Sequence, residues 1–283
     1  MWAYFCLPLQ QNSYDLEDMD NQITSSQNPK VKRVTLLQQK SSERRRSGLF
    51  VVEGQREIEH CIEAGYEVDS LFVCQQLLSD GNREFYTPDL PSDAVYVVTP
   101  QVYEKMAYRG STEGLLAVVR SRQKSLGDLH LSDNPLIVVL ERVEKPGNLG
   151  AVLRSADAAQ ADAVIVCDPL TDLYNPNLIR SSIGAIFTVP CVACTSEECI
   201  SFLKSHGISI LTAQLQDSRL YYDTDMSRGT AIVMGTESTG LTDTWRRAAD
   251  AHIRIPMLGR LDSLNVSDSA ALLLFEAVRQ RKG

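Results

Sequence analysis

The sequence predicts an α/β protein: a small N-terminal α/β region followed by a larger region built on a parallel sheet. Short apolar runs, many rich in Val and Ile, alternate with segments of helical length along most of the chain. Residues 136–140 are apolar at every position, as in a strand that is buried on both faces. With 283 residues, 43% hydrophobic and 23% charged, the chain has an ordinary globular composition and room for two cores.

In the N-terminal region the apolar runs and the glycines that follow them set the expected elements. Gly54 closes the first strand and Gly65 ends the helix that comes after it. Strands are expected over residues 49–53, 68–74, 94–99 and 115–120, and helices over 30–39 and 55–64.

The second alternation of strands and helices begins after Pro135. Gly207 is expected to stop a helix there. Strands are expected over residues 136–140, 163–167, 188–193, 208–213, 230–234 and 253–255, and helices over 149–160, 177–183, 197–205 and 267–279.

Composition sets the expected domain boundaries. Residues 1–27 contain no Lys or Arg and are expected to be a disordered extension, with Met19 as a candidate initiator. The small domain is expected over residues 28–120, a linker over 121–134 and the larger domain over 135–283.

Charge and cysteine content narrow the class of protein. A net charge of −8 argues against bulk coating of nucleic acid, and no run approaches the length of a membrane span. The seven cysteines cannot all pair within one chain, which favours a reduced, cytoplasmic protein. Cys191 and Cys194, with Cys199 and His206, allow a zinc site, but buried free thiols are the preferred interpretation and no metal ligand is assigned.

Three polar, glycine-bearing loops follow strands of the larger region, where parallel sheets build their binding crevices. The first spans residues 145–154. Pro146 and Gly147 are expected to form a turn and Asn148 to cap the next helix, which places Arg154 about two turns along it. A capped helix with a solvated arginine explains the same residues without any function.

The second loop, residues 232–241, has a glycine near each end, Gly235 and Gly240. Leu241 stands where a phosphate-binding loop has lysine, so nucleoside triphosphate hydrolysis is not expected. The glycines still allow the backbone to approach a ligand closely, and Glu237 between them can accept hydrogen bonds.

The third loop, residues 255–270, leads into the last helix. Ser267 or Ser269 is expected to cap that helix. Ser263 and Asn265 offer uncharged hydrogen-bonding groups, which suit a ligand recognised through amides and hydroxyls. The alternative is that this loop only leads into the last helix and binds nothing.

Taken in order, these three loops resemble the signature motifs of the SpoU (TrmH-type) RNA ribose 2′-O-methyltransferases, a branch of the SPOUT superfamily. Residues 174–176 and 180–185, and in the small region 28–30 and 50–54, resemble further family stretches. The matching loop positions are Asn148, Gly150, Arg154 and Ala156, then Gly235, Glu237, Gly240 and Leu241, then 255–257, Gly259, 263–267 and Ala270.

The chain departs from the family pattern at a few positions. Lys145 stands where many members have Asp, residues 112–114 read Thr-Glu-Gly in place of Pro-Gln-Gly, and Asp268 and Ser269 replace apolar or small residues. These positions bear on the choice of substrate more than on the activity.

The resemblance implies a methyltransferase that uses S-adenosylmethionine to methylate a ribose 2′-hydroxyl of RNA, with rRNA favoured and tRNA open. It also implies a deep trefoil knot in the larger domain, a homodimer with sites at its interface and a small domain that binds RNA. The implied reaction-centre residues are Asn148, Arg154, Glu237, Ser263 and Asn265. The implied cofactor-binding residues are Met234, Gly235, Gly240, Ile255, Met257 and Leu264.

A basic cluster near the start of the small region fits this implied activity. Residues 28–46 hold seven basic side chains against the single acid Glu43. The candidate RNA-binding residues within it are Lys30, Lys32, Arg33, Arg44, Arg45 and Arg46. A solvated helix face is the alternative, and a non-catalytic RNA-binding or ribosome-assembly protein on the same scaffold is the alternative function.

Overall fold

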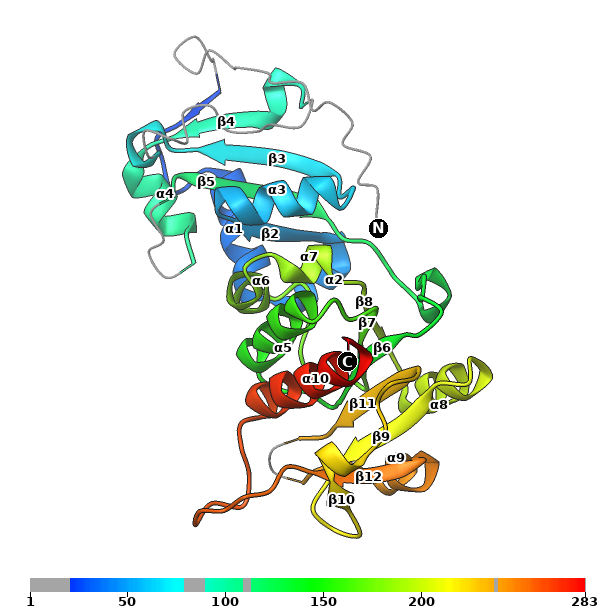
Figure 1. Cartoon of the computed structure of the whole chain (residues 1–283). Helices are drawn as coiled ribbons and strands as arrows, with labels where there is room; N and C mark the ends of the chain where they lie inside the picture. The colour runs from blue at the N-terminus through cyan, green and yellow to red at the C-terminus, as the bar shows by residue number, and fades with distance from the viewer. Residues whose placement is uncertain (1–20, 79–89, 109–112, 237–238, 283) are drawn as a thin grey trace. The chain divides into compact units, whose positions relative to one another are not determined.

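The computed structural model of the chain describes residues 21–78, 90–108, 113–236 and 239–282. The chain divides into two compact units, Met1–Arg122 and Gln123–Gly283, and each contains one β-sheet (Figure 1). Leu126, Leu129 and Leu131, from the expected linker, pack against the core of the second unit. None of the helices in the described ranges is long and apolar enough to cross a lipid bilayer.

The first unit is built on a five-stranded mixed sheet. Its strands are β1 (Gln22–Ile23), β2 (Leu49–Glu53), β3 (Val68–Val73), β4 (Val95–Val98) and β5 (Leu115–Arg120). In the order β1-β4-β3-β5-β2, strand β4 runs parallel to β1 and β3, whereas β5 is antiparallel to β3 and β2. The apolar runs of β2, β3 and β5 are buried at nearly every position, which explains why they lack alternation.

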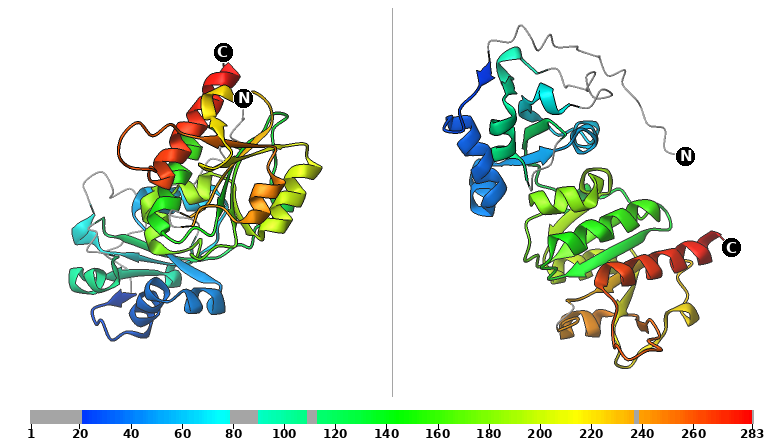
Figure 2. Two further views of the ribbon diagram at one scale, coloured as in Figure 1. Left: turned by 90° about the horizontal axis from the view of Figure 1, so that it is seen from below. Right: turned by 90° about the vertical axis from the view of Figure 1, so that its left-hand side faces the viewer.

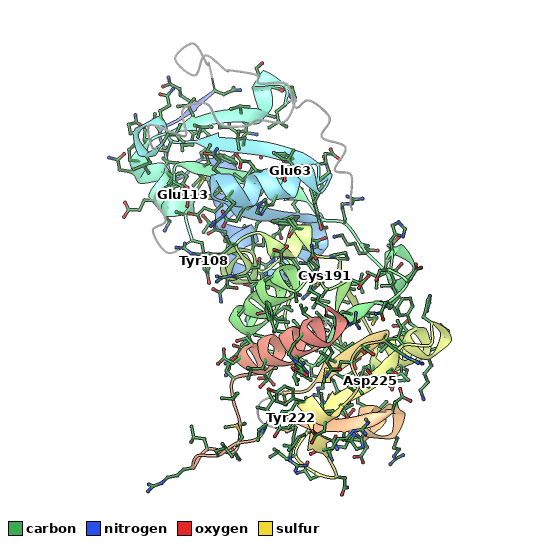
Figure 3. All side chains as sticks on the ribbon, in the orientation of Figure 1. Glu63, Tyr108, Glu113, Cys191, Tyr222 and Asp225 are labelled. Carbon is green, nitrogen blue, oxygen red and sulfur yellow. The ribbon has the colours of Figure 1, made fainter. Side chains whose placement is uncertain are left out.

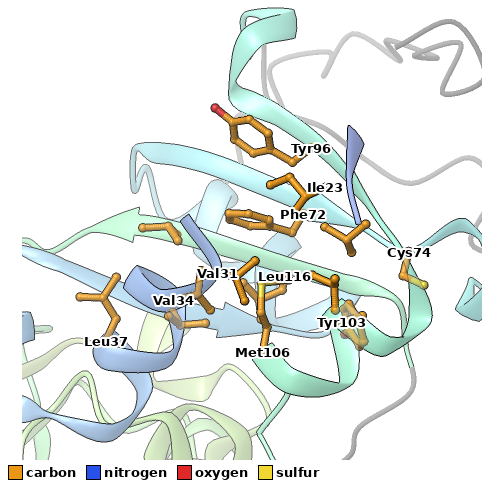
Figure 4. Packing of buried hydrophobic residues seen from close by; sticks show 14 of the residues in the cluster. Ile23, Val31, Val34, Leu37, Phe72, Cys74, Tyr96, Tyr103, Met106 and Leu116 are labelled. Carbon is orange, nitrogen blue, oxygen red and sulfur yellow. The ribbon is translucent and has the colours of Figure 1, made fainter. Parts of the chain in front are cut away.

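The α-helices in the described part of the first unit pack on this sheet. They are α1 (Pro29–Gln39), α2 (Ser41–Ser47), α3 (Gln55–Glu63) and α4 (Pro100–Met106). Helix α1 begins where the Asn28 side chain accepts a hydrogen bond from the backbone of the second helical residue. Val31 and Val34 of α1 meet Phe72 and Leu116 of the sheet in one apolar core (Figure 4).

The second unit is built on a seven-stranded sheet whose neighbouring strands are all parallel. Its strands are β6 (Leu136–Glu141), β7 (Ala163–Cys167), β8 (Cys191–Cys194), β9 (Ser209–Ala213), β10 (Arg219–Leu220), β11 (Thr230–Met234) and β12 (Ala251–Arg254). The order is β10-β12-β9-β11-β6-β7-β8. Strands β6 and β11 are therefore neighbours although they are far apart in sequence, and the loops after them meet at the same edge of the sheet.

Helices cover both faces of this sheet. They are α5 (Pro146–Ala158), α6 (Pro176–Ser182), α7 (Ala185–Thr188), α8 (Ser196–Ser205), α9 (Asp243–Ala248) and α10 (Val266–Lys282). Figure 2 (left) shows α5 and α10 on one side of the sheet and α8 and α9 on the other. Ile137 and Val139 pack with Trp245 of α9, while α10 contacts α5, β6 and β11.

Several expected boundaries are wrong, each for a local reason. The strand expected over 188–193 is β8, residues 191–194, because the apolar residues 185–188 coil into α7 after a left-handed Gly184. The strand expected over 253–255 begins earlier, as β12. Helices α2, α4 and α9 were not expected, since six or seven residues carry too little periodicity to reveal a helix.

Candidate functional site

The glycine-bearing loop after β11 folds back on itself. A Cβ atom at Gly235 would overlap the backbone of Gly240 and Leu241, so this position accepts only glycine. The Gly240 amide donates to the Thr236 carbonyl at 3.0 Å, and Gly240 has a left-handed φ of 67°. Met234, the last residue of β11, is buried. Glu237 lies outside the described residues.

A buried carboxylate holds the far end of this loop. Glu141 is the last residue of β6 and only 3% exposed. It accepts hydrogen bonds from the backbone amide of Thr242 at 2.8 Å and from the Thr242 hydroxyl at 2.6 Å. Our sequence analysis missed Glu141. The available signal was one acidic residue at the end of an otherwise apolar strand.

The first loop is more helical than the sequence indicated. Pro146 and Gly147 do not form a separate turn but begin α5, and Asn148 lies inside its first turn rather than capping it. Proline suits this first helical position because its missing N–H has no partner there anyway. A Cβ atom at Gly150 would overlap the side chain of Ser181, so this glycine permits the close packing of α5 on α6.

An asparagine pair joins the first loop to the third. The Asn265 side-chain amide donates to the side-chain oxygen of Asn148 at 3.3 Å. The Asn265 side-chain oxygen accepts from the Ser267 amide at 2.8 Å and from its hydroxyl at 2.6 Å. Asn265 therefore caps α10, and the expectation that Ser267 or Ser269 would do so is wrong, because the asparagine lies just before the first helical residue.

The three loops meet at one pocket of the second unit. A pocket of about 140 Å³ is lined by Asn148, Gly235, Thr236 and Val266, one or more from each loop, together with Glu141. The sequence order of the loops therefore corresponds to a spatial cluster at the carboxyl ends of β6 and β11.

The third loop also lines two apolar pockets at the ends of β9 and β12. A pocket of about 160 Å³ is lined by residues that include Ile255, Met257, Ser263 and Leu264. A wider one of about 460 Å³ shares Ile255 and Met257 with it and adds Leu261. The wider pocket lies by itself within the size range typical of small-molecule sites, and both have mostly apolar walls.

Arg154 lies apart from these pockets. It is exposed on α5 and has no hydrogen bond or ion pair with any residue that the structure describes. At 3.6 residues per turn, the six positions between Asn148 and Arg154 turn the two side chains about 120° apart around the helix. Arg154 is not among the lining residues of the three pockets above.

The basic cluster of the first unit is not exposed at every position. The exposed candidate residues are Lys30, Lys32, Arg33, Arg45 and Arg46. The Lys30 ammonium lies 4.4 Å from the centre of the Tyr96 ring. Arg46 pairs with Glu43 at 2.6 Å.

Arg44 differs from the other members of this cluster because it is 5% exposed. Its guanidinium donates to the carbonyls of Leu37 and Gln38, near the end of α1. These carbonyls have no partner within the helix, so Arg44 stabilises the junction of α1 and α2. We therefore leave Arg44 out of any RNA-binding surface.

The cysteines are grouped differently from their spacing in the sequence. Cys194 and Cys199 lie beside Cys167 of β7, and the three sulfur atoms are all within 4.8 Å of one another. Cys191 and His206 are not in this group. Hydrogen bonds from Cys167 and Cys199 hold the pKa of the Cys194 thiol below its usual value.

Each of the two units matches the model of a known protein family. Residues 135–275 match the model of the SpoU rRNA Methylase family, and residues 28–117 match that of the MRM3-like substrate binding domain. A 23S rRNA (uridine(2479)-2′-O)-methyltransferase from Streptomyces viridochromogenes is 30% identical to this chain, over 91% of the chain and 92% of that protein.

Solved structures agree with the family match. A crystal structure of an RNA 2′-O ribose methyltransferase has a TM-score of 0.82 and 39% identity, covering 93% of this chain and all of its own. An AdoMet-bound rRNA methyltransferase from Sinorhizobium meliloti has a TM-score of 0.80 and 28% identity, covering 91% of this chain and 97% of its own. The chain therefore belongs to the SpoU rRNA methylase family and is an S-adenosylmethionine-dependent RNA 2′-O-methyltransferase.

Proposed function

We propose that this enzyme methylates a ribose 2′-hydroxyl in the RNA of the large ribosomal subunit, at a site built by the three loops of the second unit. The observation that carries the proposal is the pocket to which each loop contributes, together with the hydrogen bond between Asn148 and Asn265. The similarity to a 23S rRNA 2′-O-methyltransferase over most of both chains supports the choice of RNA.

The residues around the third loop fit S-adenosylmethionine. Ile255, Met257 and Leu264 provide apolar walls for an adenine ring, and Gly235, where a Cβ would overlap backbone, leaves room for close approach of main-chain groups. We assign cofactor binding to these residues and to Met234 and Gly240, which flank the folded-back loop. When bound, the cofactor supplies an electrophilic methyl group on a sulfonium sulfur.

The residues of this chain then position the acceptor and manage its proton. Asn148, Ser263 and Asn265 offer uncharged hydrogen-bonding groups that orient a ribose. Arg154 is a poor base, because guanidinium stays protonated in proteins. We assign it to bidentate binding of the phosphate beside the target ribose and to stabilising the developing alkoxide. Glu237 or that phosphate takes up the hydroxyl proton.

A second copy of the chain completes the proposed site. Arg154 and Asn148 point to different sides of α5, so one chain does not present both to the same ribose. Exposed apolar side chains surround the third loop and continue onto α10, a patch that a partner would cover. They are Leu258 (96% exposed), Leu261 (75%), Leu264 (39%), Leu272 (43%) and Phe275 (48%).

Two further features belong to the proposal. We infer the trefoil knot from membership of the family; after β12, near one edge of the sheet, the chain returns as α10 to pack on α5 and on the central strands. Residues 28–120 form the RNA-binding domain, and the exposed candidate residues of its basic cluster are Lys30, Lys32, Arg33, Arg45 and Arg46. A cytoplasmic location is supported by the free cysteines of the described residues.

Transfer of tritium from labelled S-adenosylmethionine to purified RNA tests the proposal. We expect labelling of large-subunit rRNA and not of tRNA. Arg154→Lys keeps the charge but loses bidentate binding of the phosphate, so labelling is expected to fall about 100-fold or more. Calorimetry is expected to give an unchanged cofactor affinity. Arg247→Lys, on the exposed end of α9, is the matched control. Normal turnover in Arg154→Lys contradicts the role of that residue.

Mixing two inactive variants tests the shared site. Arg154→Ala and Gly235→Ala homodimers are each expected to be inactive. If Arg154 acts on the cofactor site of its partner, a mixed dimer contains one intact site and activity returns after subunit exchange. Failure to recover activity, with exchange shown by native mass spectrometry, contradicts the interface site.

A further inference from the structure

Three cysteine sulfurs from three elements of the second unit meet on the face of the sheet covered by α8 and α9. Cys167 ends β7, Cys194 ends β8, and Cys199 lies in the first turn of α8. Their sulfur atoms all lie within 4.8 Å of one another. Cys167 and Cys199 are fully buried, whereas Cys194 is partly exposed.

Strand register and a helix cap bring the three together. Cys167 and Cys194 are paired positions of the parallel strands β7 and β8, so their side chains lie on the same face. Thr195 and Glu198 form a capping box that fixes the first turn of α8, and with it Cys199.

The remaining cysteine of the CxxC is excluded by the same geometry. Cys191, labelled in Figure 3, is three residues before Cys194, and an odd spacing on a strand places two side chains on opposite faces. His206 lies after the last turn of α8, where its Nδ1 is 2.8 Å from the Phe202 carbonyl. The fold therefore does not bring Cys191 and His206 together in the zinc site that the sequence spacing allowed.

Hydrogen bonds around the cluster hold its elements in place. The Asp168 carboxylate, next to Cys167, accepts hydrogen bonds from the amide and hydroxyl of Ser196 at 3.2 and 2.6 Å. The Trp245 indole donates to the same hydroxyl at 3.0 Å. Ser196 begins α8 and Cys199 lies in its first turn, so the bonds that hold Ser196 also hold Cys199 in place.

Three thiolates at this separation match a soft d¹⁰ metal ion. Tetrahedral zinc with Zn–S bonds of about 2.3 Å separates its sulfur ligands by roughly 3.8 Å, so sulfurs within 4.8 Å need to move only slightly. Thiolate ligands select zinc over oxygen-preferring ions such as magnesium and calcium. The partly exposed side of Cys194 gives solvent access, so that a water molecule can take the fourth position.

We propose that Cys167, Cys194 and Cys199 bind one Zn²⁺ ion, which ties the ends of β7 and β8 to the start of α8. None of these cysteines lines the pockets assigned to methyl transfer, so the ion lies outside the proposed reaction site. Binding requires no oxidant. The three thiols lose their protons to solvent as the three Zn–S bonds form, and the zinc exchanges its bound waters.

The full chain, purified with a reductant and without chelator, tests the site. We expect one zinc per chain by elemental mass spectrometry. After removal of zinc, Co²⁺ is expected to give the intense thiolate-to-cobalt absorption of a tetrahedral site. Cys194→Ser and Cys199→Ala lose both signals, while the matched control Cys191→Ala, also on β8, keeps both.

A measurement on the unchanged protein covers the case in which a buried cysteine variant fails to fold. Zn²⁺ is expected to protect three thiols from a thiol reagent under native conditions, and mapping by mass spectrometry is expected to identify them as Cys167, Cys194 and Cys199. The proposal is overturned if zinc protects no thiol. It is equally overturned if Cys191→Ala loses the metal, or if a disulfide occupies the cluster and no metal binds after reduction.

Discussion

The buried contact between Glu141 and Thr242 is expected to stabilise the second unit and to hold the glycine-bearing loop after β11. Thr242→Val keeps the shape of the side chain and removes only its hydroxyl, which donates to the Glu141 carboxylate at 2.6 Å. The 3%-exposed carboxylate has little access to water to replace that donor. The backbone amide bond to the other carboxylate oxygen remains.

The expected magnitude follows from the charge and burial of the acceptor. A hydrogen bond to a charged group contributes about 1.5–3 kcal/mol. In a unit of this size, each kcal/mol shifts the melting temperature by about 2–4 °C, so Thr242→Val is expected to lower it by about 3–12 °C. Thr242→Ser keeps both donors and is the matched control.

Thermal unfolding followed by calorimetry measures this shift, and titration calorimetry measures the affinity for S-adenosylmethionine. We expect weaker cofactor binding in Thr242→Val, since Thr242 directly follows the loop that begins at Gly235. In a Glu141→Gln background the same change is expected to cost less, because the acceptor is neutral. An unchanged melting temperature, or an equal loss in both backgrounds, refutes the role given to Glu141.

Three other variants test separate parts of the site. Gly235→Ala is expected to abolish cofactor binding in calorimetry because its Cβ overlaps backbone, and an unchanged affinity contradicts this. Asn265→Ala removes the α10 cap and lowers stability by about 1 kcal/mol, whereas Asn265→Asp keeps the cap but loses the donor to Asn148, so only its turnover falls. Replacing Lys32 and Arg33 by Glu is expected to weaken rRNA binding and flatten its salt dependence, and equal salt slopes would argue against that surface.

Local chemistry determined the places where glycine ends a helix. Gly65 and Gly207 were expected to stop helices, and both have left-handed φ values, 76° and 65°, just after α3 and α8. The capping residue of α10, in contrast, could not be chosen from the local sequence. Asn265, Ser267 and Ser269 are all good caps by composition, and only the position of the first helical turn selects Asn265.

Contacts between distant segments could not be predicted in the same way. Glu141 gained its role because β6 and β11 are neighbours, which brings Thr242 to its carboxylate. The cysteine spacing pointed to Cys191, whereas the register of β7 and β8 selected Cys167. Arg44, one of several similar cations in the sequence, is buried because α1 ends beside it.

By itself, the sequence determined the α/β class, the longer strands and helices and the three loops that resemble the family motifs, because apolar periodicity and glycine act within a few residues. Only the tertiary structure decided which side chains meet: the Asn148–Asn265 contact, the Glu141–Thr242 anchor and the group of three cysteines. The physical reason is that hydrogen bonds and sulfur contacts form over a few ångströms. Strand order and register, which no local pattern encodes, bring these distant residues within that range.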